Sequence, residues 1–153
     1  MNAKPGLVRH GLTLFLAGLA TGFIVPLTLN PRAGLSGHLE GVMNGTFLVA
    51  LGCAWPELRL GASAGRLVYG LVIFGTWANW AGTLLSAVLG TSKATPIAGA
   101  GHAGTPIQEN LVLGILAATG LAMVVAVGVT AWHLWRGANE APAAPPLVNS
   151  KRA

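Results

Sequence analysis

Four apolar stretches, each about as long as an α-helix must be to cross a bilayer, constrain the fold of this chain most strongly. They cover residues 11–29, 39–55, 67–89 and 110–135, and one crossing needs about 20 residues. Only 8% of the residues are charged, whereas soluble domains, whose surfaces face water, carry about 25%. The sequence therefore predicts an all-α fold, an integral membrane four-helix bundle in residues 1–136.

The two ends of the chain need separate interpretations. The first apolar stretch follows Lys4 and Arg9, as in a signal peptide, but it is long and no Ala-x-Ala cleavage pattern follows it. We therefore expect a retained helix that ends at Asn30-Pro31. Residues 137–153 are rich in Ala and Pro, a composition that predicts a disordered tail.

The distribution of Lys and Arg predicts that both termini lie in the cytoplasm. Two of the segments that flank the apolar stretches are assigned to the outer side, and their only basic residues are Arg32 and Lys93. Cytoplasmic flanks are normally richer in basic residues, so we expect a multi-pass protein of the inner membrane with a cytoplasmic tail. The formal charge of +5 does not predict a nucleic-acid partner, because the basic residues lie at segment ends. The inner side collects Lys4, Arg9, Arg59, Arg66, Arg136, Lys151 and Arg152.

Small residues recur at a spacing of four within the apolar stretches. The pairs are Gly18–Gly22, Gly41–Gly45 and Ala78–Gly82. Such steps allow helix backbones to approach closely in membranes. They predict a tightly packed protein that assembles as a homo-oligomer.

Polar side chains inside the apolar stretches gather at one level. An ionisable or amide group in hydrocarbon is costly unless it has a partner or a function. Glu40 and Asn44 share a helix face because they are four residues apart. In the third stretch, a polar stripe on one helix face is formed by Thr76, Asn79, Thr83 and Ser86. The fourth stretch begins with polar residues. We expect one site in the outer half, near Glu40, Asn44, Asn79, Thr83, Ser86, Gln108, Glu109 and Asn110.

Each of these residues also has a structural interpretation. Thr83, like Ser and Thr in many membrane helices, fits a hydrogen bond to its own backbone. Gln108 and Glu109 fit a role in capping the helix that follows them. Asn44 and Asn79 are harder to explain by local structure, because each brings several hydrogen-bonding groups into the hydrocarbon.

His38 stands at the start of the second stretch, where the helix dipole disfavours the imidazolium form. The neutral imidazole ligates metals and haem iron, although the position alone favours an interfacial histidine bonded to lipid headgroups or to the loop. No second histidine or cysteine has the spacing of a zinc site. Trp77 and Trp80 flank Asn79, where they fit either packing or stacking on a flat ligand. The glycine-rich loop 90–106 fits a lid over the site or slack chain.

Three segments resemble the hydroxylaminobenzene mutases. They are the run NPRAGLSGHLEGVMNGTFLVALG from Asn30 to Gly52, TWANW from Thr76 to Trp80, and PIAGAGHAGTPIQE from Pro96 to Glu109. The resemblance extends over the chain to about residue 137. It implies an isomerase that moves the hydroxyl of an N-arylhydroxylamine to the ortho ring carbon, giving a 2-aminophenol in nitroaromatic degradation.

The chain is also similar, more distantly, to the styrene oxide isomerases. The shared pattern is a histidine, an Asn-Gly six residues later, and a Trp-Ala-Asn. This resemblance implies that His38 is the axial ligand of haem b between the protomers of a homotrimer, and that Asn44 and Asn79 line the pocket. The chain departs from that family at Gly75 and Thr83, where the isomerases have an acid and a tyrosine, and these departures count against epoxide isomerisation.

Together, the residues and the resemblance predict a membrane mutase in which haem iron acts as Lewis acid on the N–O bond. The alternatives are an epoxide isomerase and a non-enzymatic haem-binding or scaffold protein. The expected catalytic residues are Glu40, Asn44, Asn79 and Glu109. The expected substrate-binding residues are Trp77, Trp80, Thr83 and Gln108. The metal contact is His38, through haem iron alone.

Overall fold

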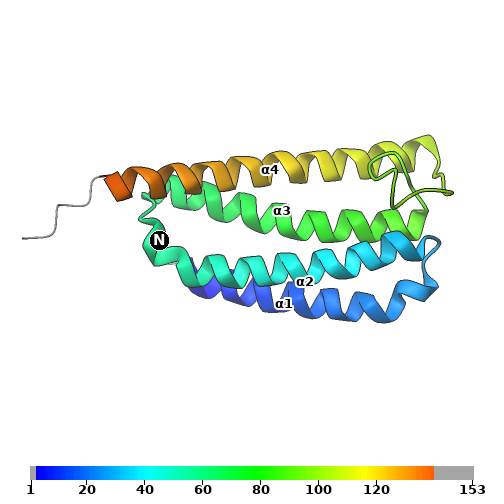
Figure 1. The fold of residues 1–153 in the computed structure, drawn as a ribbon, viewed down its shortest axis with the longest axis horizontal. Helices are drawn as coiled ribbons and strands as arrows, with labels where there is room; N and C mark the ends of the chain where they lie inside the picture. Colours follow the sequence, from blue (N-terminus) through cyan, green and yellow to red (C-terminus); the bar gives the residue numbers. More distant parts are fainter. Residues whose placement is uncertain (1–2, 140–153) are drawn as a thin grey trace, which may run out of the picture.

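The computed structural model describes residues 3–139, and all regular elements in this part of the chain are helical. Four long helices run side by side (Figure 1). They are α1 Lys4–Ile24, α2 Pro31–Ala54, α3 Ala62–Leu89 and α4 Pro106–Asn139, with short 3-10 helices η1 Val25–Leu27 and η2 Trp55–Leu58 after α1 and α2. The predicted tail, 137–153, lies outside the described residues from position 140 onward.

Local sequence explains where α2 begins and where α3 ends. The Asn30 side chain accepts hydrogen bonds from the backbone N–H groups of Arg32 and Ala33, at 3.1 and 3.2 Å. Pro31 follows in the first helical turn, where its missing N–H costs no hydrogen bond. Helix α3 ends at Gly90, whose φ of 64° lies in the left-handed region that favours glycine.

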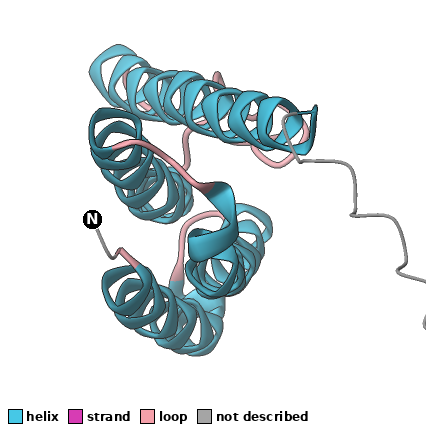
Figure 2. Ribbon diagram, turned by 90° about the vertical axis from the view of Figure 1, so that its left-hand side faces the viewer, coloured by secondary structure: helices cyan, strands magenta, loops and turns pink. Residues whose placement is uncertain are grey.

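Each helix packs mainly against the next one in sequence. Helix α2 lies between α1 and α3, and α4 packs along α3. Figure 2 shows the four helices from one end, with α1 and α4 at the two outer positions. The two faces of α2 are therefore covered by different helices, one by α1 and the other by α3.

Three of the four helices are long and apolar enough to cross a membrane. They are α1 extended to Leu27, α3, and α4 to Arg136. Large apolar side chains on the outer helices are exposed, among them Phe23 at 85% and Val124 at 72%, as expected where lipid is the solvent. Helix α2 is not apolar enough to be counted with them, because it carries Glu40 and other polar residues together with several glycines.

The glycines of α1 and α2 form the closest helix contact. A Cβ atom on Gly18 would lie 2.5 Å from the backbone nitrogen of Val42, and one on Gly45 would lie 2.5 Å from the backbone nitrogen of Phe15. The backbones of Gly18 and Gly41 touch so closely that neither tolerates a side chain. Two of the predicted small-residue steps thus lie on the α1–α2 contact.

We predict that Gly18→Ala destabilises the protein by about 1–3 kcal/mol, the usual cost of overpacking a close contact. The added methyl group meets backbone atoms of α2, which cannot rotate away. The measurement is the melting temperature in detergent. Gly120→Ala in α4 is the matched control, since a Cβ there meets nothing within 4 Å. Equal melting temperatures for the two variants would contradict the close approach.

The loop between α3 and α4 is held by the carboxylate of Glu109. This side chain accepts hydrogen bonds from the backbone N–H groups of Ser92 at 3.1 Å, Lys93 at 2.8 Å and Gly104 at 2.8 Å. Gln108 accepts from the backbone N–H of Thr105 at 2.8 Å, which caps the start of α4. Glu109 thus ties both ends of the loop to α4.

The middle of the same loop is attached to the start of α2. The Asn30 amide donates to the Ala98 carbonyl at 2.8 Å, and the Arg32 guanidinium donates to the Ile97 carbonyl at 3.3 Å. The His102 ring also contacts the Leu29 carbonyl at 3.1 Å. The loop therefore has a fixed course over the ends of α2 and α3.

We predict that Glu109→Gln loosens this loop. The amide has one acceptor oxygen and no charge, so it cannot replace a carboxylate that accepts from three backbone N–H groups. Hydrogen exchange at residues 92–104 should become faster. Glu57→Gln, at the opposite end of the molecule, should leave that exchange unchanged. Unaltered protection in Glu109→Gln would contradict the assigned role.

Candidate active site

A cavity of about 310 Å³ lies between α2, α3, α4 and the loop. Glu40, Asn79 and Thr83, three of the residues that the sequence predicts for the site, line it. Loop residues cover one side and Leu116 of α4 closes another. The remaining lining residues are Ala33, Ser36, Ala94, Thr95 and Ala98.

The Glu40 carboxylate joins α2 to α3 inside this cavity. Its Oε2 atom accepts a hydrogen bond from the amide of Asn79 and another, at 3.3 Å, from the amide of Asn44. The same Asn44 amide lies 3.5 Å from the Thr76 carbonyl of α3. Both amides act on one carboxylate oxygen, so the other oxygen has no hydrogen-bond partner among the described residues. A carboxylate held this way can exchange a proton with a bound ligand.

The remaining residues of the α3 polar stripe have structural partners. Thr76 donates to the Val72 carbonyl at 2.7 Å, one turn earlier in its own helix. Ser86 accepts a hydrogen bond from the Thr91 hydroxyl at 2.8 Å, where the loop begins. Of this stripe, Asn79 and Thr83 alone line the cavity.

His38 lies on the opposite side of α2 from Glu40. Its Nδ1 atom is 2.8 Å from the Gly18 carbonyl of α1, and a carbonyl only accepts, so Nδ1 carries the proton. The ring also packs against Gly22. Positions two apart in a helix differ by about 200° around the axis. A single chain thus does not bring the imidazole to the cavity.

The two tryptophans also lie toward α1. Trp80 donates from its ring nitrogen to the Thr21 hydroxyl at 3.1 Å and packs over Gly41. Trp77 meets Trp80 edge to face, with ring centroids 5.8 Å apart. Its own ring nitrogen is buried without a hydrogen-bond partner in the described part of the chain. Neither tryptophan lines the Glu40 cavity, and neither do Glu109 and Gln108, which hold the loop.

Ser36 and Thr95 line the cavity, although neither is among the residues that the sequence predicts for the site. Ser36 precedes Glu40 by four residues, so helical periodicity already places it on the same face. No sequence pattern locates Thr95, because its position depends on how Asn30 and Glu109 fix the loop.

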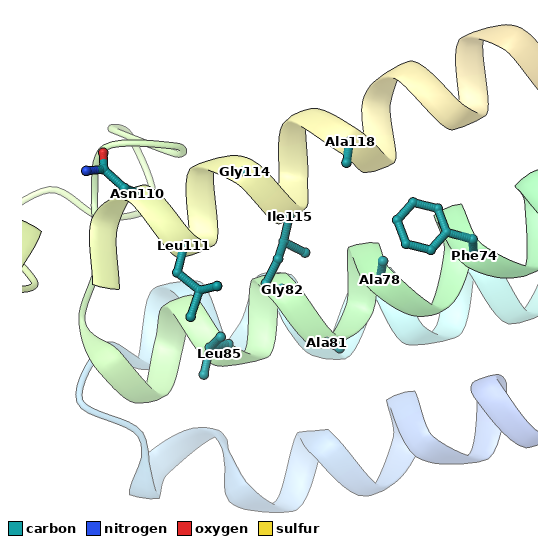
Figure 3. A pocket seen from close by; sticks show the side chains of 10 residues that line it. All are labelled: Phe74, Ala78, Ala81, Gly82, Leu85, Asn110, Leu111, Gly114, Ile115 and Ala118. Carbon is teal, nitrogen blue, oxygen red and sulfur yellow. The ribbon is translucent and has the colours of Figure 1, made fainter. Parts of the chain in front are cut away.

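A larger hollow of about 590 Å³ is lined by residues of α3 and α4 (Figure 3). Its walls are almost entirely apolar, with Phe74 toward one end and Asn110 at the other. None of the lining residues is a carboxylate, histidine or cysteine. This crevice offers space for an apolar group but no acid–base chemistry.

Comparison with known proteins identifies the family. The family model described as styrene oxide isomerase matches residues 4–135. Hydroxylaminobenzene mutase HabB of Ectopseudomonas oleovorans is 46% identical over 145 residues, which cover 92% of this chain and 88% of that protein. Hydroxylaminobenzene mutase HabA of the same organism is 44% identical over 111 residues, which cover 72% and 82%.

These matches confirm both resemblances predicted from the sequence. The matched region contains α1, α2, α3, α4 up to residue 135, the cavity and the loop that covers it. The chain therefore belongs to the styrene oxide isomerase family and is an isomerase of the mutase type.

Proposed function

We propose that the protein converts an N-arylhydroxylamine, such as hydroxylaminobenzene, to a 2-aminophenol. The observation that carries the proposal is the Glu40 carboxylate beside a cavity of about 310 Å³, which has one oxygen held by two amides and the other without a partner among residues 3–139. The names of the two mutase relatives supply the substrate class.

The reaction is an isomerisation, so every atom of the substrate reappears in the product. The N–O bond breaks, oxygen bonds to the ortho carbon, and the proton on that carbon must leave to restore the aromatic ring. Glu40 is the base that takes this proton and the acid that returns it to nitrogen. Asn79 and Thr83, which line the same cavity, orient the NH–OH group by hydrogen bonds.

The apolar part of the cavity protects the reaction from water. Ala33, Ala98 and Leu116 lie around the polar residues. Water would otherwise attack the para carbon of the electron-poor ring and give a different product. The loop that contains Ala98 is fixed by Asn30, so the cover is in place before the substrate binds.

Haem b is the cofactor that we propose, and the residues around His38 fit it. Because Nδ1 donates to the Gly18 carbonyl, the neutral ring keeps the lone pair of Nε2 for a metal. Exposed apolar side chains, Leu35 and Phe23 among them, lie on the adjoining surface of α1 and α2, which suits a flat apolar macrocycle. When bound, haem iron supplies a Lewis acid for the N–O group.

The assembly that we propose follows from the two faces of α2. His38 and Glu40 point to opposite sides of that helix, so an arrangement in which His38 of one chain approaches the cavity of the next would unite them. We propose a homotrimer, as the family resemblance implies, in the inner membrane. All four helices would cross the bilayer with both termini in the cytoplasm, α2 being covered by α1 and α3.

Membranes that contain the protein should convert phenylhydroxylamine to 2-aminophenol, and Glu40→Gln should lower kcat by about 100-fold or more through loss of the acid–base group. Product analysis by liquid chromatography measures both. Glu57→Gln, in η2 at the far end, is the matched control and should keep full activity. Wild-type turnover by Glu40→Gln at equal protein and haem content would remove Glu40 from the reaction.

Epoxide isomerisation is the second candidate, because the matching family model carries that description. The same membranes should be offered styrene oxide, with phenylacetaldehyde as the product to be measured. Turnover of styrene oxide without turnover of phenylhydroxylamine would replace the proposed function by this one.

His38→Ala should abolish the Soret band of the detergent-purified protein together with its activity. The purified wild-type protein should show that band, since the ring is the proposed axial ligand. Substitution of His102, whose ring contacts the loop-side carbonyl of Leu29, should leave the spectrum unchanged. A full Soret band in His38→Ala would end the ligand assignment.

A further inference from the structure

A second cavity adjoins the one that contains Glu40. It measures about 470 Å³ and shares three lining residues with the first cavity, namely Ser36, Thr95 and Ala98. From this common rim it extends past Arg32 to Ile97. The shared residues make the two cavities neighbours with one boundary between them.

The second cavity lies where polar and apolar surroundings meet. Arg32, at the start of α2, is exposed, and Ile97 in the loop is 86% exposed. Exposed arginine beside exposed isoleucine is typical of the level at which headgroups meet hydrocarbon. An aromatic ring that carries a polar NH–OH group concentrates at this level.

The crevice between α3 and α4 is the other possible route, but helix packing separates it from Glu40. A Cβ atom on Gly82 would lie 2.8 Å from Ile115 and 3.1 Å from Leu116. These contacts press α4 against α3 between the two hollows. The crevice and the Glu40 cavity have no lining residue in common.

We infer that the substrate reaches Glu40 through the mouth between α2 and the loop, and that Ser36 is the specificity-determining residue there. Ser36 lines both cavities and stands one helical turn before Glu40. Its side chain therefore sets the width available to the ring before the ring meets the carboxylate. This inference rests on the proposed function, because it concerns the route of the same substrate.

The test uses a cysteine that can be enlarged after the protein has folded. Ser36→Cys is made in a Cys53→Ala background, since Cys53 is exposed and would otherwise react. The membranes are treated with methanethiosulfonate reagents of increasing size and assayed with phenylhydroxylamine. Ala118→Cys, exposed on the wall of the crevice, is the matched control.

Unmodified Ser36→Cys should be active, which shows that it folds. Modification should then lower kcat/KM by about tenfold or more, with larger reagents acting more strongly and kcat falling less, because access to the site is slowed. 2-Aminophenol should protect the introduced thiol of Ser36→Cys from reaction. Modified Ala118→Cys should keep its activity.

Two results would overturn the inference while leaving the proposed function intact. One is full activity of modified Ser36→Cys, and the other is equal loss at Ser36→Cys and Ala118→Cys. A wild-type protein that does not turn over any arylhydroxylamine is a different result, because it removes the proposed function itself.

Discussion

The Glu40 carboxylate is partly buried, so water cannot solvate it fully. Amide groups from two helices donate hydrogen bonds to it instead. Asn44 lies one turn away on α2, and Asn79 lies across on α3. A carboxylate among apolar side chains is costly to bury unless hydrogen bonds replace its water. Removing either amide would leave the carboxylate with one hydrogen-bond donor fewer. This constraint fixes the register between α2 and α3, and with it the position of the cavity.

The opposite face of α2 obeys a different constraint. Glycines there let α1 approach until the backbones of Gly18 and Gly41 touch. The same contact brings the Gly18 carbonyl within 2.8 Å of His38, so packing also sets which ring nitrogen carries the proton. Close helix packing and the orientation of the imidazole therefore depend on the same residues. A larger side chain at Gly18 would disturb both the helix contact and the orientation of the imidazole.

Sequence reasoning can locate the four helices from their apolar runs and the polar residues of the cavity from periodicity. It does not give the helix ends, since α2 begins at Pro31 and not near residue 39. It predicts that Glu40, Asn44, Asn79 and Thr83 come together, and the structure brings them together. It cannot place Glu109, since a carboxylate at a helix start fits a cap, a loop anchor or a site equally well until the loop has a course. Nor can it separate His38 from Glu40 by depth alone. Helical periodicity sets them about 200° apart, but which neighbouring helix each one faces is known only from the structure.

Helix α2 carries the carboxylate, one of its amide partners and the histidine, yet it is the helix that is less apolar than the three long enough and apolar enough to cross a membrane. The two facts have one cause. Polar groups that would be costly against lipid are tolerated where α1 and α3 cover them, and glycines make that cover close enough to be effective. The outer helices can then be nearly uniform in their apolar character, because they carry little of the chemistry. The polar residues of α2 and the apolar surfaces of α1 and α4 thus both follow from the position of α2 between α1 and α3.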